Sequence, residues 1–370
     1  MALIGKPQTL KEVNSSTIER LLFKHGTLTQ PKLAELAELS LPTVNRIISD
    51  LEDTGTVCAA GHTTEGAGRK AVLYQINSDA GCIVVLYYSW GKYLCRLTDI
   101  VGNTLYETVC ELDNSTSRAA IDSTVLAVET VLGHARSDVK VIGIGIPGAL
   151  MPDGKIFAIP KIEVWEGVDL EKELSVYFDA PIYIENDVKL TAVGYYNAYL
   201  RKKKVDNFVY IYAGNGMGSG IIINKKLYRG SSNFSGELGF MAPLDGEAPQ
   251  FDYTMEGGYL ENKMTPFIND YKRGSENANH SSTSALVNFF TSIAANYTAI
   301  INPAAIVFGG EAFNEALSDE IRKRLALFSP ERSISHIIYD DSEDSGINGL
   351  VLACVGEMIN DVRIIQTGGV

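Results

Sequence analysis

Three polar residues stand together where a short apolar run gives way to a helical pattern. They are Glu185, Asn186 and Asp187, in the segment IENDVK at residues 184–189. At a strand end, the Asp187 carboxylate can accept a proton from a hydroxyl group, and the Asn186 amide can hydrogen-bond a neighbouring hydroxyl. An aspartate here is equally suited to cap the following helix. The segment predicts either a contact with a polyhydroxy ligand such as a sugar or a plain helix cap.

Two further glutamates follow glycines later in the chain. Glu237 lies in SGELGF at residues 235–240, and Glu261 lies in GGYLEN at residues 257–262. A carboxylate presented by a glycine turn is suited to bind sugar hydroxyls, and it is equally able to bond the local backbone. Both interpretations stay open from the residues alone.

Three glycine-containing turns complete the polar motifs. Residues 143–148 (GIGIPG) end an apolar run, residues 213–221 (AGNGMGSGI) lie between two apolar runs, and Gly309 and Gly310 follow the run AAIVF. Backbone N–H groups in such loops can cradle phosphates, but glycine loops also form ordinary hairpins. The candidate nucleotide contacts are Gly214, Gly216, Gly218, Gly309 and Gly310, with the last pair also suited to a turn that only shapes the fold.

The elements that position these residues alternate between strand and helix patterns. Strands are predicted at 83–88, 92–100, 104–112, 139–146, 182–184, 209–213, 220–223 and 305–308, and helices at 119–135, 188–200, 284–301 and 351–363. Strand-then-helix alternation occurs twice along the chain. We therefore predict an α/β body of two lobes with a cleft between them.

The first part of the chain has a different pattern. Helices are predicted at 14–25, 30–38 and 41–54, with Thr29 and Ser40 as N-caps and prolines in the first turns of the last two. Two strand-like runs, 57–60 and 71–76, flank a glycine-rich polar loop. Two short helices separated by a tight turn and followed by such a hairpin predict a winged helix-turn-helix. A plain three-helix bundle with solvated polar faces is the alternative.

A helix-turn-helix places the first residues of its second helix in the major groove of DNA. Arg46 suits guanine, Asn45 suits adenine, and Thr43 suits a thymine methyl group or a phosphate. Ser40, Thr29 and the helix N-termini suit phosphates, and Arg69 and Lys70 would anchor the wing. The predicted DNA contacts are Thr29, Ser40, Pro42, Thr43, Asn45, Arg46, Arg69 and Lys70.

Composition bounds the class of protein. The net charge of −13 lies entirely outside residues 1–75, which are neutral. A neutral head on an acidic body is compatible with DNA binding by the head only. Five dispersed cysteines without a C-x-x-C pair predict reduced thiols in a cytoplasmic protein. No apolar run approaches the roughly 18 residues that span a bilayer, and no secretion signal precedes the head.

In order and spacing, these motifs resemble the ROK family of repressors, open reading frames and sugar kinases. The resemblance rests on IPG, END, GNGMGSG, GELG, GYLE and NPAAIVFGG behind LSLPTVNRIISDLEDTG and GRKAVLYQIN. It implies an actin- and hexokinase-like two-lobed domain that self-associates. It places Asp187 where family kinases keep the catalytic base. It places Gly148, Asn186, Asp187, Glu237 and Glu261 among the sugar contacts.

The chain departs from the family's kinases at the phosphate loops. Where the kinases have D-x-G-G-T, residues 82–97 read CIVVLYYSWGKYLCRL, and Asn215 replaces the threonine of the second loop. Phosphoryl transfer depends on charges positioned around the phosphates and Mg²⁺. We therefore expect no kinase activity, although Asp187 would be the base if the chain were a kinase.

The family's zinc site also has no counterpart here. Phe240 stands in place of its histidine, and Asp252, Thr254 and Tyr259 stand in place of its cysteines. Zinc prefers sulfur and nitrogen ligands, so neither a metal nor another cofactor is expected. Packing by Phe251, Tyr253 and Tyr259 would have to hold this segment instead.

The resulting prediction is a winged helix-turn-helix at residues 1–78 and a ROK domain at residues 79–370. Lobe I covers about 79–190 plus a C-terminal helix at 350–363, and lobe II covers about 191–349. The expected function is that of a sugar-responsive regulator, most simply a repressor. Its partners would be operator DNA and a sugar or phosphosugar, in a homodimer or dimer of dimers without membrane contact. The alternatives are an ATP-dependent sugar kinase and a protein-controlled regulator with a vestigial cleft.

Overall fold

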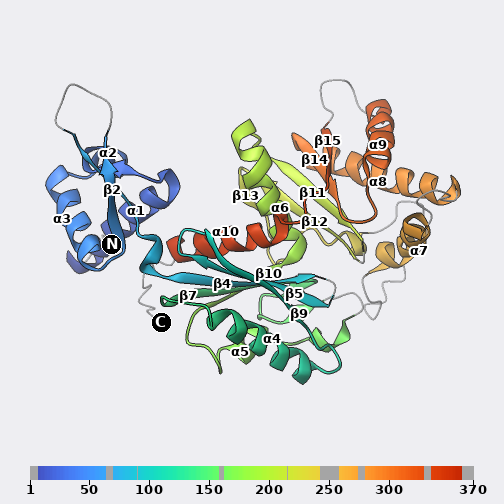
Figure 1. The fold of residues 1–370 in the computed structure, drawn as a ribbon. Coiled ribbons are helices and arrows are strands. Elements are labelled where there is room, and N and C mark those ends of the chain that lie inside the picture. The colour runs from blue at the N-terminus through green and yellow to red at the C-terminus, as the bar shows by residue number, and fades with distance from the viewer. Residues whose placement is uncertain are drawn as a thin grey trace, which may run out of the picture.

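The computed structural model describes residues 7–63, 70–89, 91–157, 162–214, 216–241, 258–273, 280–328 and 335–360. Within these ranges a small helical head precedes two lobes that are each built on a five-stranded sheet (Figure 1). None of the described helices combines the length and apolarity needed to cross a bilayer.

The head contains three helices and a small antiparallel sheet. The elements are α1 (Pro7–His25), β1 (Leu28–Thr29), α2 (Gln30–Ala37), α3 (Leu41–Asp53), β2 (Val57–His62) and β3 (Val72–Ile76), with strand order β1-β3-β2. Helix α1 begins seven residues before the predicted start. The apolar faces predicted from sequence meet in one core that includes Ile18, Leu22, Leu33 and Ile47.

Both predicted caps in the head are present. The Thr29 hydroxyl accepts a hydrogen bond from the Lys32 backbone N–H at 3.4 Å. The Ser40 hydroxyl accepts one from the Thr43 N–H at 3.3 Å. These bonds satisfy N–H groups that the first turn of a helix leaves without partners. The break between α2 and α3 is therefore fixed by side chains that the sequence identifies.

The first lobe is built on a sheet with strand order β10-β7-β4-β5-β6. Its elements are η1 (Ser78–Ala80), β4 (Cys82–Ser89), β5 (Lys92–Asp99), β6 (Thr104–Glu111), α4 (Ser117–Leu132), β7 (Val139–Ile146), β8 (Ala149–Leu150), β9 (Ile156–Phe157), η2 (Glu163–Trp165), α5 (Leu170–Leu174) and β10 (Ile182–Asn186). Strands β10, β7 and β4 run parallel, so their carboxyl ends lie at one edge of the sheet.

The second lobe repeats the plan with strand order β13-β12-β11-β14-β15. Its elements are α6 (Asp187–Tyr195), the π-helical turn η3 (Tyr196–Leu200), η4 (Arg201–Lys203), β11 (Phe208–Ala213), β12 (Met217–Ile223), β13 (Lys226–Leu227), η5 (Leu238–Phe240), α7 (Tyr259–Arg273), α8 (His280–Ile300), β14 (Ala305–Gly309), α9 (Glu315–Phe328) and β15 (His336–Asp340). Elements α7, α9 and β15 were not predicted. Strand β12 begins at Met217, three residues before the predicted start at Gly220, so Gly218 lies in the strand rather than in the glycine loop.

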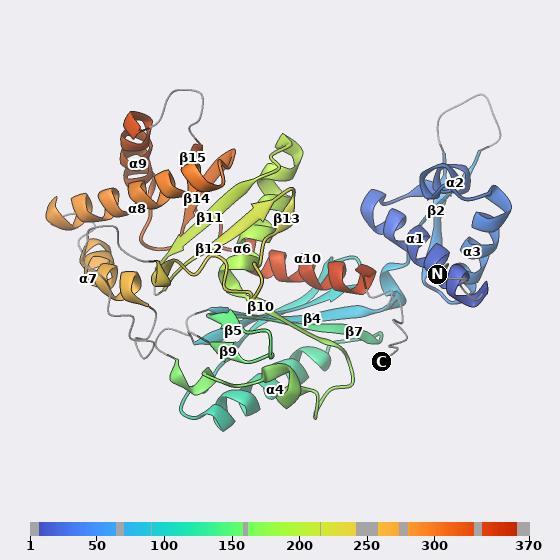
Figure 2. The same ribbon diagram turned by 180° about the vertical axis from the view of Figure 1, so that it is seen from behind.

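The last helix, α10 (Ser345–Asn360), returns to the first lobe and begins earlier than the predicted position 350. It packs on β4 and β7 and crosses α6, and its end lies beside the head (Figure 2). At the crossing the two backbones touch. A Cβ added to Gly194 would lie 1.9 Å from the Ser345 carbonyl oxygen, and one added to Gly349 would lie 1.9 Å from the Leu190 carbonyl oxygen.

This contact generates a stability prediction. We expect Gly349→Ala to lower the free energy of unfolding by about 1–3 kcal/mol, because the added methyl forces backbone apart in a packed core. Gly356→Ala is the control, since it lies on the same helix with no atom within 4 Å of an added Cβ. It should stabilise by roughly 0.5–1 kcal/mol through helix propensity. Urea denaturation measures both, and equal effects of the two substitutions would contradict the assignment.

Candidate functional site

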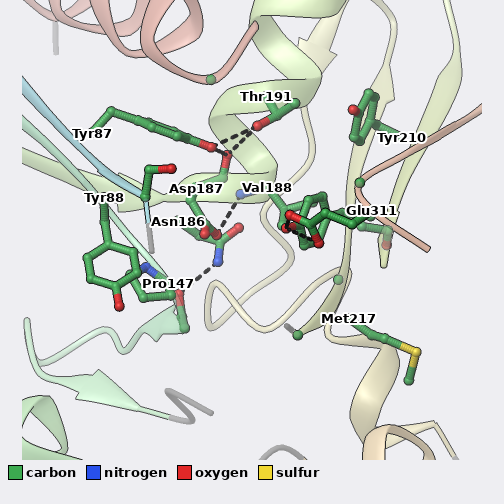
Figure 3. A pocket seen from close by; sticks show the side chains of 18 of the residues that line it. Tyr87, Tyr88, Pro147, Asn186, Asp187, Val188, Thr191, Tyr210, Met217 and Glu311 are labelled. Carbon is green, nitrogen blue, oxygen red and sulfur yellow. Dashed lines mark hydrogen bonds between the residues drawn. The ribbon is translucent and has the colours of Figure 1, made fainter. Parts of the chain in front are cut away.

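A cavity of about 940 Å³ lies between the two lobes (Figure 3). Its lining comes from β4, from the ends of β7 and β10, from α6, and from the glycine turns of the second lobe. All five residues predicted to contact a sugar line it, namely Gly148, Asn186, Asp187, Glu237 and Glu261. The fold thus gathers on one cavity polar groups that are up to 113 positions apart in the sequence.

The register of the first sheet explains why Gly148 and Asn186 meet. Asn186 at the end of β10 pairs with Ile146 at the end of β7. Its side-chain amide donates to the Gly148 carbonyl at 2.9 Å, and its side-chain oxygen accepts from the Lys189 N–H at 2.9 Å. Asn186, rather than Asp187, is therefore the N-cap of α6. One side chain fixes both the strand-end turn and the helix start.

Asp187 is left to face the cavity from the first turn of α6. One carboxylate oxygen accepts a hydrogen bond from the Val188 N–H at 2.7 Å. Burial raises the pKa of Asp187 to about 7, and the nearby Glu237 carboxylate adds to this rise. A carboxylate with such a pKa is poised to exchange a proton with a ligand hydroxyl near neutral pH.

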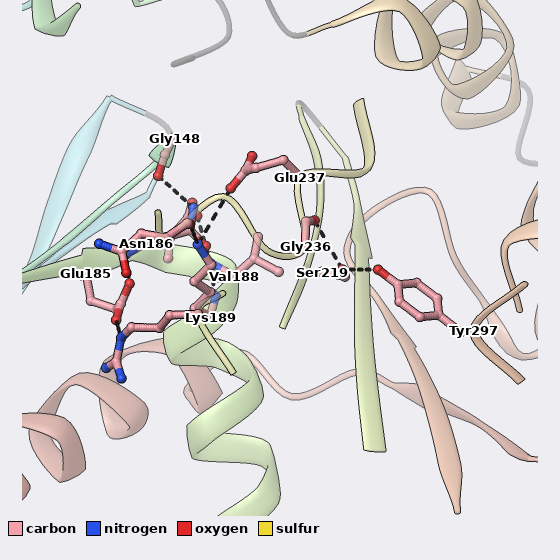
Figure 4. Close-up of polar contacts among 12 residues, drawn as sticks. Gly148, Glu185, Asn186, Val188, Lys189, Ser219, Gly236, Glu237 and Tyr297 are labelled. Carbon is pink, nitrogen blue, oxygen red and sulfur yellow. Dashed lines mark hydrogen bonds and ion pairs between the residues drawn. The ribbon is translucent and has the colours of Figure 1, made fainter. Parts of the chain in front are cut away.

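Glu237 is held in place by Lys189, a buried lysine on α6 that the sequence motifs do not indicate. Lys189 is 1% exposed, and its ammonium lies 3.8 Å from a Glu237 carboxylate oxygen (Figure 4). The same ammonium donates to the Asn233 carbonyl. Burial raises the pKa of Glu237 to about 7, against the attraction of Lys189. No motif marks Lys189, because its role depends on a loop 44 residues away.

The loop that carries Glu237 is fixed to strand β12. Gly236 has φ of +94°, and a Cβ there would lie 2.0 Å from the Ser219 carbonyl oxygen. The Ser219 hydroxyl contacts both the Gly236 carbonyl at 3.1 Å and the Tyr297 hydroxyl at 2.7 Å. Only glycine allows this approach, so the G-E pair found in the sequence has a positional reason.

Glu261 forms a local contact as well as lining the cavity. Its side chain is buried in the first turn of α7, and a carboxylate oxygen accepts from the Met217 N–H at 3.1 Å. Met217 begins β12 immediately after the glycine turn. Glu261 therefore anchors this turn through a local hydrogen bond, which was the alternative to a sugar contact.

The candidate nucleotide glycines are closely covered by side chains. An added Cβ would lie 2.0 Å from a Glu311 oxygen at Gly214, 1.9 Å from the Tyr210 hydroxyl at Gly309 and 2.8 Å from the Tyr212 ring at Gly310. Gly216, Gly218 and Gly310 line the cavity. Gly214 and Gly309 do not belong to its lining. A glutamate and a tyrosine thus lie against Gly214 and Gly309, whereas at Gly310 the nearest atom is the Ala213 backbone carbonyl oxygen, at 2.5 Å.

The cavity has a one-sided charge. Seven carboxylates line it, and no lysine, arginine or histidine is present among its described lining residues. The seven are Asp187, Glu237, Glu261, Glu311, Asp340, Asp341 and Glu343. Like charges repel more strongly near a protein interior than in bulk water. Two of the seven are paired with lysines outside the lining, Glu237 with Lys189 at 3.8 Å and Glu311 with Lys272 at 3.2 Å, and the lining itself stays acidic.

The two described residues at the family's zinc position, Phe240 and Tyr259, both pack against other apolar side chains. Phe240 packs near Phe234 and Phe157, with ring centroids 5.2 Å and 6.1 Å away. Tyr259 begins helix α7 and packs against the core of the second lobe. An aromatic hydrocarbon ring offers zinc no ligand atom. Phe251, Asp252, Tyr253 and Thr254 lie outside the described residues.

The predicted DNA contacts of the head lie on the accessible face of α3. Pro42, Asn45 and Arg46 are exposed and Thr43 is half-buried, while Val44, Ile47 and Ile48 face the core. Lys70, at the end of the wing, is exposed. Arg69 lies outside the described residues. The hydroxyls of Thr29 and Ser40 are engaged as caps, which leaves their outer lone pairs to any phosphate contact.

Comparison with known proteins agrees with this arrangement. Residues 91–251 match the model of the ROK family, and residues 20–57 match a model of winged helix-turn-helix DNA-binding domains. The chain is 29% identical to the xylose repressor of Bacillus subtilis over 244 residues. That match covers 65% of this chain and 63% of the relative's length, so it spans less than two thirds of the relative.

Two solved structures share the fold. A ROK family transcriptional regulator, a homologue of the E. coli MLC protein, superposes with a TM-score of 0.70 at 18% identity, covering 94% of this chain and all of that one. A ROK hexokinase from Thermus thermophilus superposes with a TM-score of 0.61 at 17% identity, covering 75% of this chain and 99% of that one. By the family-model matches, residues 91–251 belong to a ROK family domain and residues 20–57 to a winged helix-turn-helix.

Proposed function

We propose that the chain is a transcription regulator, most simply a repressor, that binds operator DNA through its head and an uncharged sugar in the cleft. The observation that carries the proposal is the pairing of an exposed α3 face with a cleft that is lined by carboxylates, amides and hydroxyl groups and by no cation among its described residues. Xylose is a first candidate, because the relative from Bacillus subtilis is a xylose repressor. A homodimer would present two heads to a palindromic operator.

The sugar would control the head by changing the balance between open and closed lobes. Gly148 and Asn186 lie at strand ends of the first lobe and Glu237 lies in the second, so a sugar bonded to both lobes favours the closed arrangement. Helix α10 lies against the first lobe and α6, and the Arg20 side chain in the head donates to the Ile359 carbonyl at 3.0 Å. A shift of α10 is thereby transmitted to the head.

The alternative function is ATP-dependent phosphorylation of a sugar. Asp187 favours it, because a raised pKa suits a catalytic base. Against it stand the carboxylate lining and the tyrosines beside the glycine turns, since transfer requires positive charge around the phosphates. We therefore propose that the cleft senses sugar without phosphorylating it.

DNA binding is tested by Arg46→Ala. We expect operator affinity to fall about 5- to 100-fold, the usual cost of losing one bidentate base contact. DNA selected from a randomised pool supplies the operator, and a mobility shift measures affinity. Arg118→Ala on α4, which removes an equally charged and exposed side chain from the body, should leave affinity within about twofold. An unchanged affinity for Arg46→Ala would contradict base reading by α3.

Ligand charge is tested by titrating D-xylose, D-glucose, glucose 6-phosphate and ATP in a calorimeter. We expect one of the neutral sugars to bind and the phosphorylated ligands to bind at least about tenfold more weakly, because their charge meets seven carboxylates. Release of ADP in the presence of ATP and sugar should stay at background. Tight binding of a phosphosugar, or turnover that Asp187→Asn abolishes, would instead support the kinase or phosphosugar alternatives.

Sugar affinity should also depend on pH. The pKa of Asp187 and that of Glu237 are both raised to about 7, so at lower pH both lose the charged form that accepts hydroxyl hydrogen bonds. From pH 6 to pH 8 the ionised fraction of each group rises about tenfold, so we expect sugar affinity to rise about tenfold where one carboxylate must be ionised and about 100-fold where both must. The double variant Asp187→Asn, Glu237→Gln should bind weakly with a flat profile. A flat profile in the unmodified protein would refute this assignment.

A further inference from the structure

A second cavity, of about 600 Å³, lies where the head meets the body. The head contributes residues from α1 and β3, and the body contributes residues from β5, from the turn after it, from η3 and from α10. Figures 1 and 2 both place the end of α10 beside the head. The cavity is separate from the sugar cleft, because the two linings share no residue.

One buried cation lines this junction cavity. Arg96 on β5 is 7% exposed, and its guanidinium donates to the Asn348 side-chain oxygen at 2.6 Å and to Glu107 at 3.3 Å. Its third nitrogen, Nε, is buried and has no hydrogen-bond partner among the described residues. A buried donor on a charged group costs free energy when it is unpaired. No acceptor among the described residues meets this donor, so it can pair with an acceptor on a ligand once the side chain turns toward the cavity.

A second pair of opposite charges on the same two strands is fully at the surface, so the fold does not require the Arg96 cation to be buried. Lys92 and Arg96 on β5 stand directly opposite Glu111 and Glu107 on β6. Lys92 meets Glu111 at 2.8 Å at the surface, with its side chain half exposed. Arg96 instead turns inward beneath the head, and its glutamate partner stays more than half exposed. Only the pair of Arg96 and Glu107 places its cation in a cavity.

The rest of the lining defines the ligand that fits. Arg96 is the single charged residue among the described lining residues, in contrast to the sugar cleft. Gln75, Asn197 and Asn348 add amide groups, and Phe23 and Leu352 add apolar surface. A guanidinium edge formed by Nε and a terminal nitrogen matches the two oxygens of a carboxylate or a phosphate. The polar side chains suit an oxyanion group, and the apolar side chains suit a short carbon chain attached to it.

We propose that the junction cavity binds a small organic oxyanion, a carboxylate or a phosphate monoester, through Arg96. A molecule in this cavity contacts the head and the body at the same time, because both line it. The bound molecule therefore favours the placement of the head to which it binds most tightly. The size of this preference equals the difference between its binding free energies for the alternative placements. The site would make head placement responsive to a second metabolite, independently of the sugar.

Three-carbon probes test the proposal on the full chain without DNA. Glycerate carries a carboxylate, glycerol 3-phosphate carries a phosphate, and glycerol is the neutral control. In calorimetry we expect saturable binding of at least one of the two anions and none of glycerol. The anion that binds identifies the chemistry. Absence of saturable binding for both anions would overturn the proposal.

Variants then assign binding to the cavity. Arg96→Met and Leu352→Trp, which fills the space while keeping the guanidinium, should each weaken anion binding at least tenfold. Lys92→Met removes the matched surface cation and should leave binding unchanged within twofold. Unaltered anion binding by both Arg96→Met and Leu352→Trp would refute the site. Because DNA and sugar are absent, failure here is distinguishable from failure of the proposed function.

Discussion

The close contact between helices α6 and α10 at Gly194 and Gly349 connects the first sheet, the cleft and the head. Each glycine leaves room for a carbonyl oxygen of the opposite helix, at a distance that no Cβ tolerates. Backbones in contact cannot be pressed closer, so the two helices form one tightly packed unit. The sugar cleft begins at one end of this unit, with Asp187 as the first residue of α6, and the head contacts its other end near Ile359.

The chemistry of the cleft follows from which charges are present and which are missing. Carboxylates of Asp187 and Glu237 with pKa values near 7 provide acceptors for hydroxyl groups, and buried Lys189 supports the second of them from behind. The lining offers no cation to a phosphate among its described residues. The same fold in the Thermus thermophilus hexokinase shows that the scaffold alone does not decide between sensing and catalysis. The side chains around the glycine turns are a better guide to whether the cleft can hold the phosphates that catalysis requires.

The local features of this protein were well predicted from sequence. The caps at Thr29 and Ser40, the apolar faces of the head helices and most strands have the positions that periodicity and capping rules indicate. The cluster of END, GELG and GYLE on one cavity was expected from the family resemblance, and the geometry supplies the reasons. Asn186 must cap α6 and hold Gly148, and Gly236 must approach Ser219.

Features that depend on distant contacts were missed. Lys189 pairs with a loop 44 positions away, and Tyr210 and Tyr212 cover glycines from neighbouring strands. The unpartnered nitrogen of Arg96 depends on α10 and the head lying above β5. No local pattern encodes such contacts, because they depend on the packing of whole elements. The roles of individual DNA and sugar contacts, the domain limits and the dimer remain predictions.

Coupling between the cleft and the head is tested most directly by reciprocal titration. The dissociation constant of the tightest-binding neutral sugar is measured on the free protein and on the protein saturated with its selected DNA. DNA affinity is then measured with and without that sugar. Thermodynamic linkage requires the same factor in both directions, and we predict weaker sugar binding on DNA by about 5- to 150-fold. A sugar affinity that is identical on and off DNA would contradict the coupling.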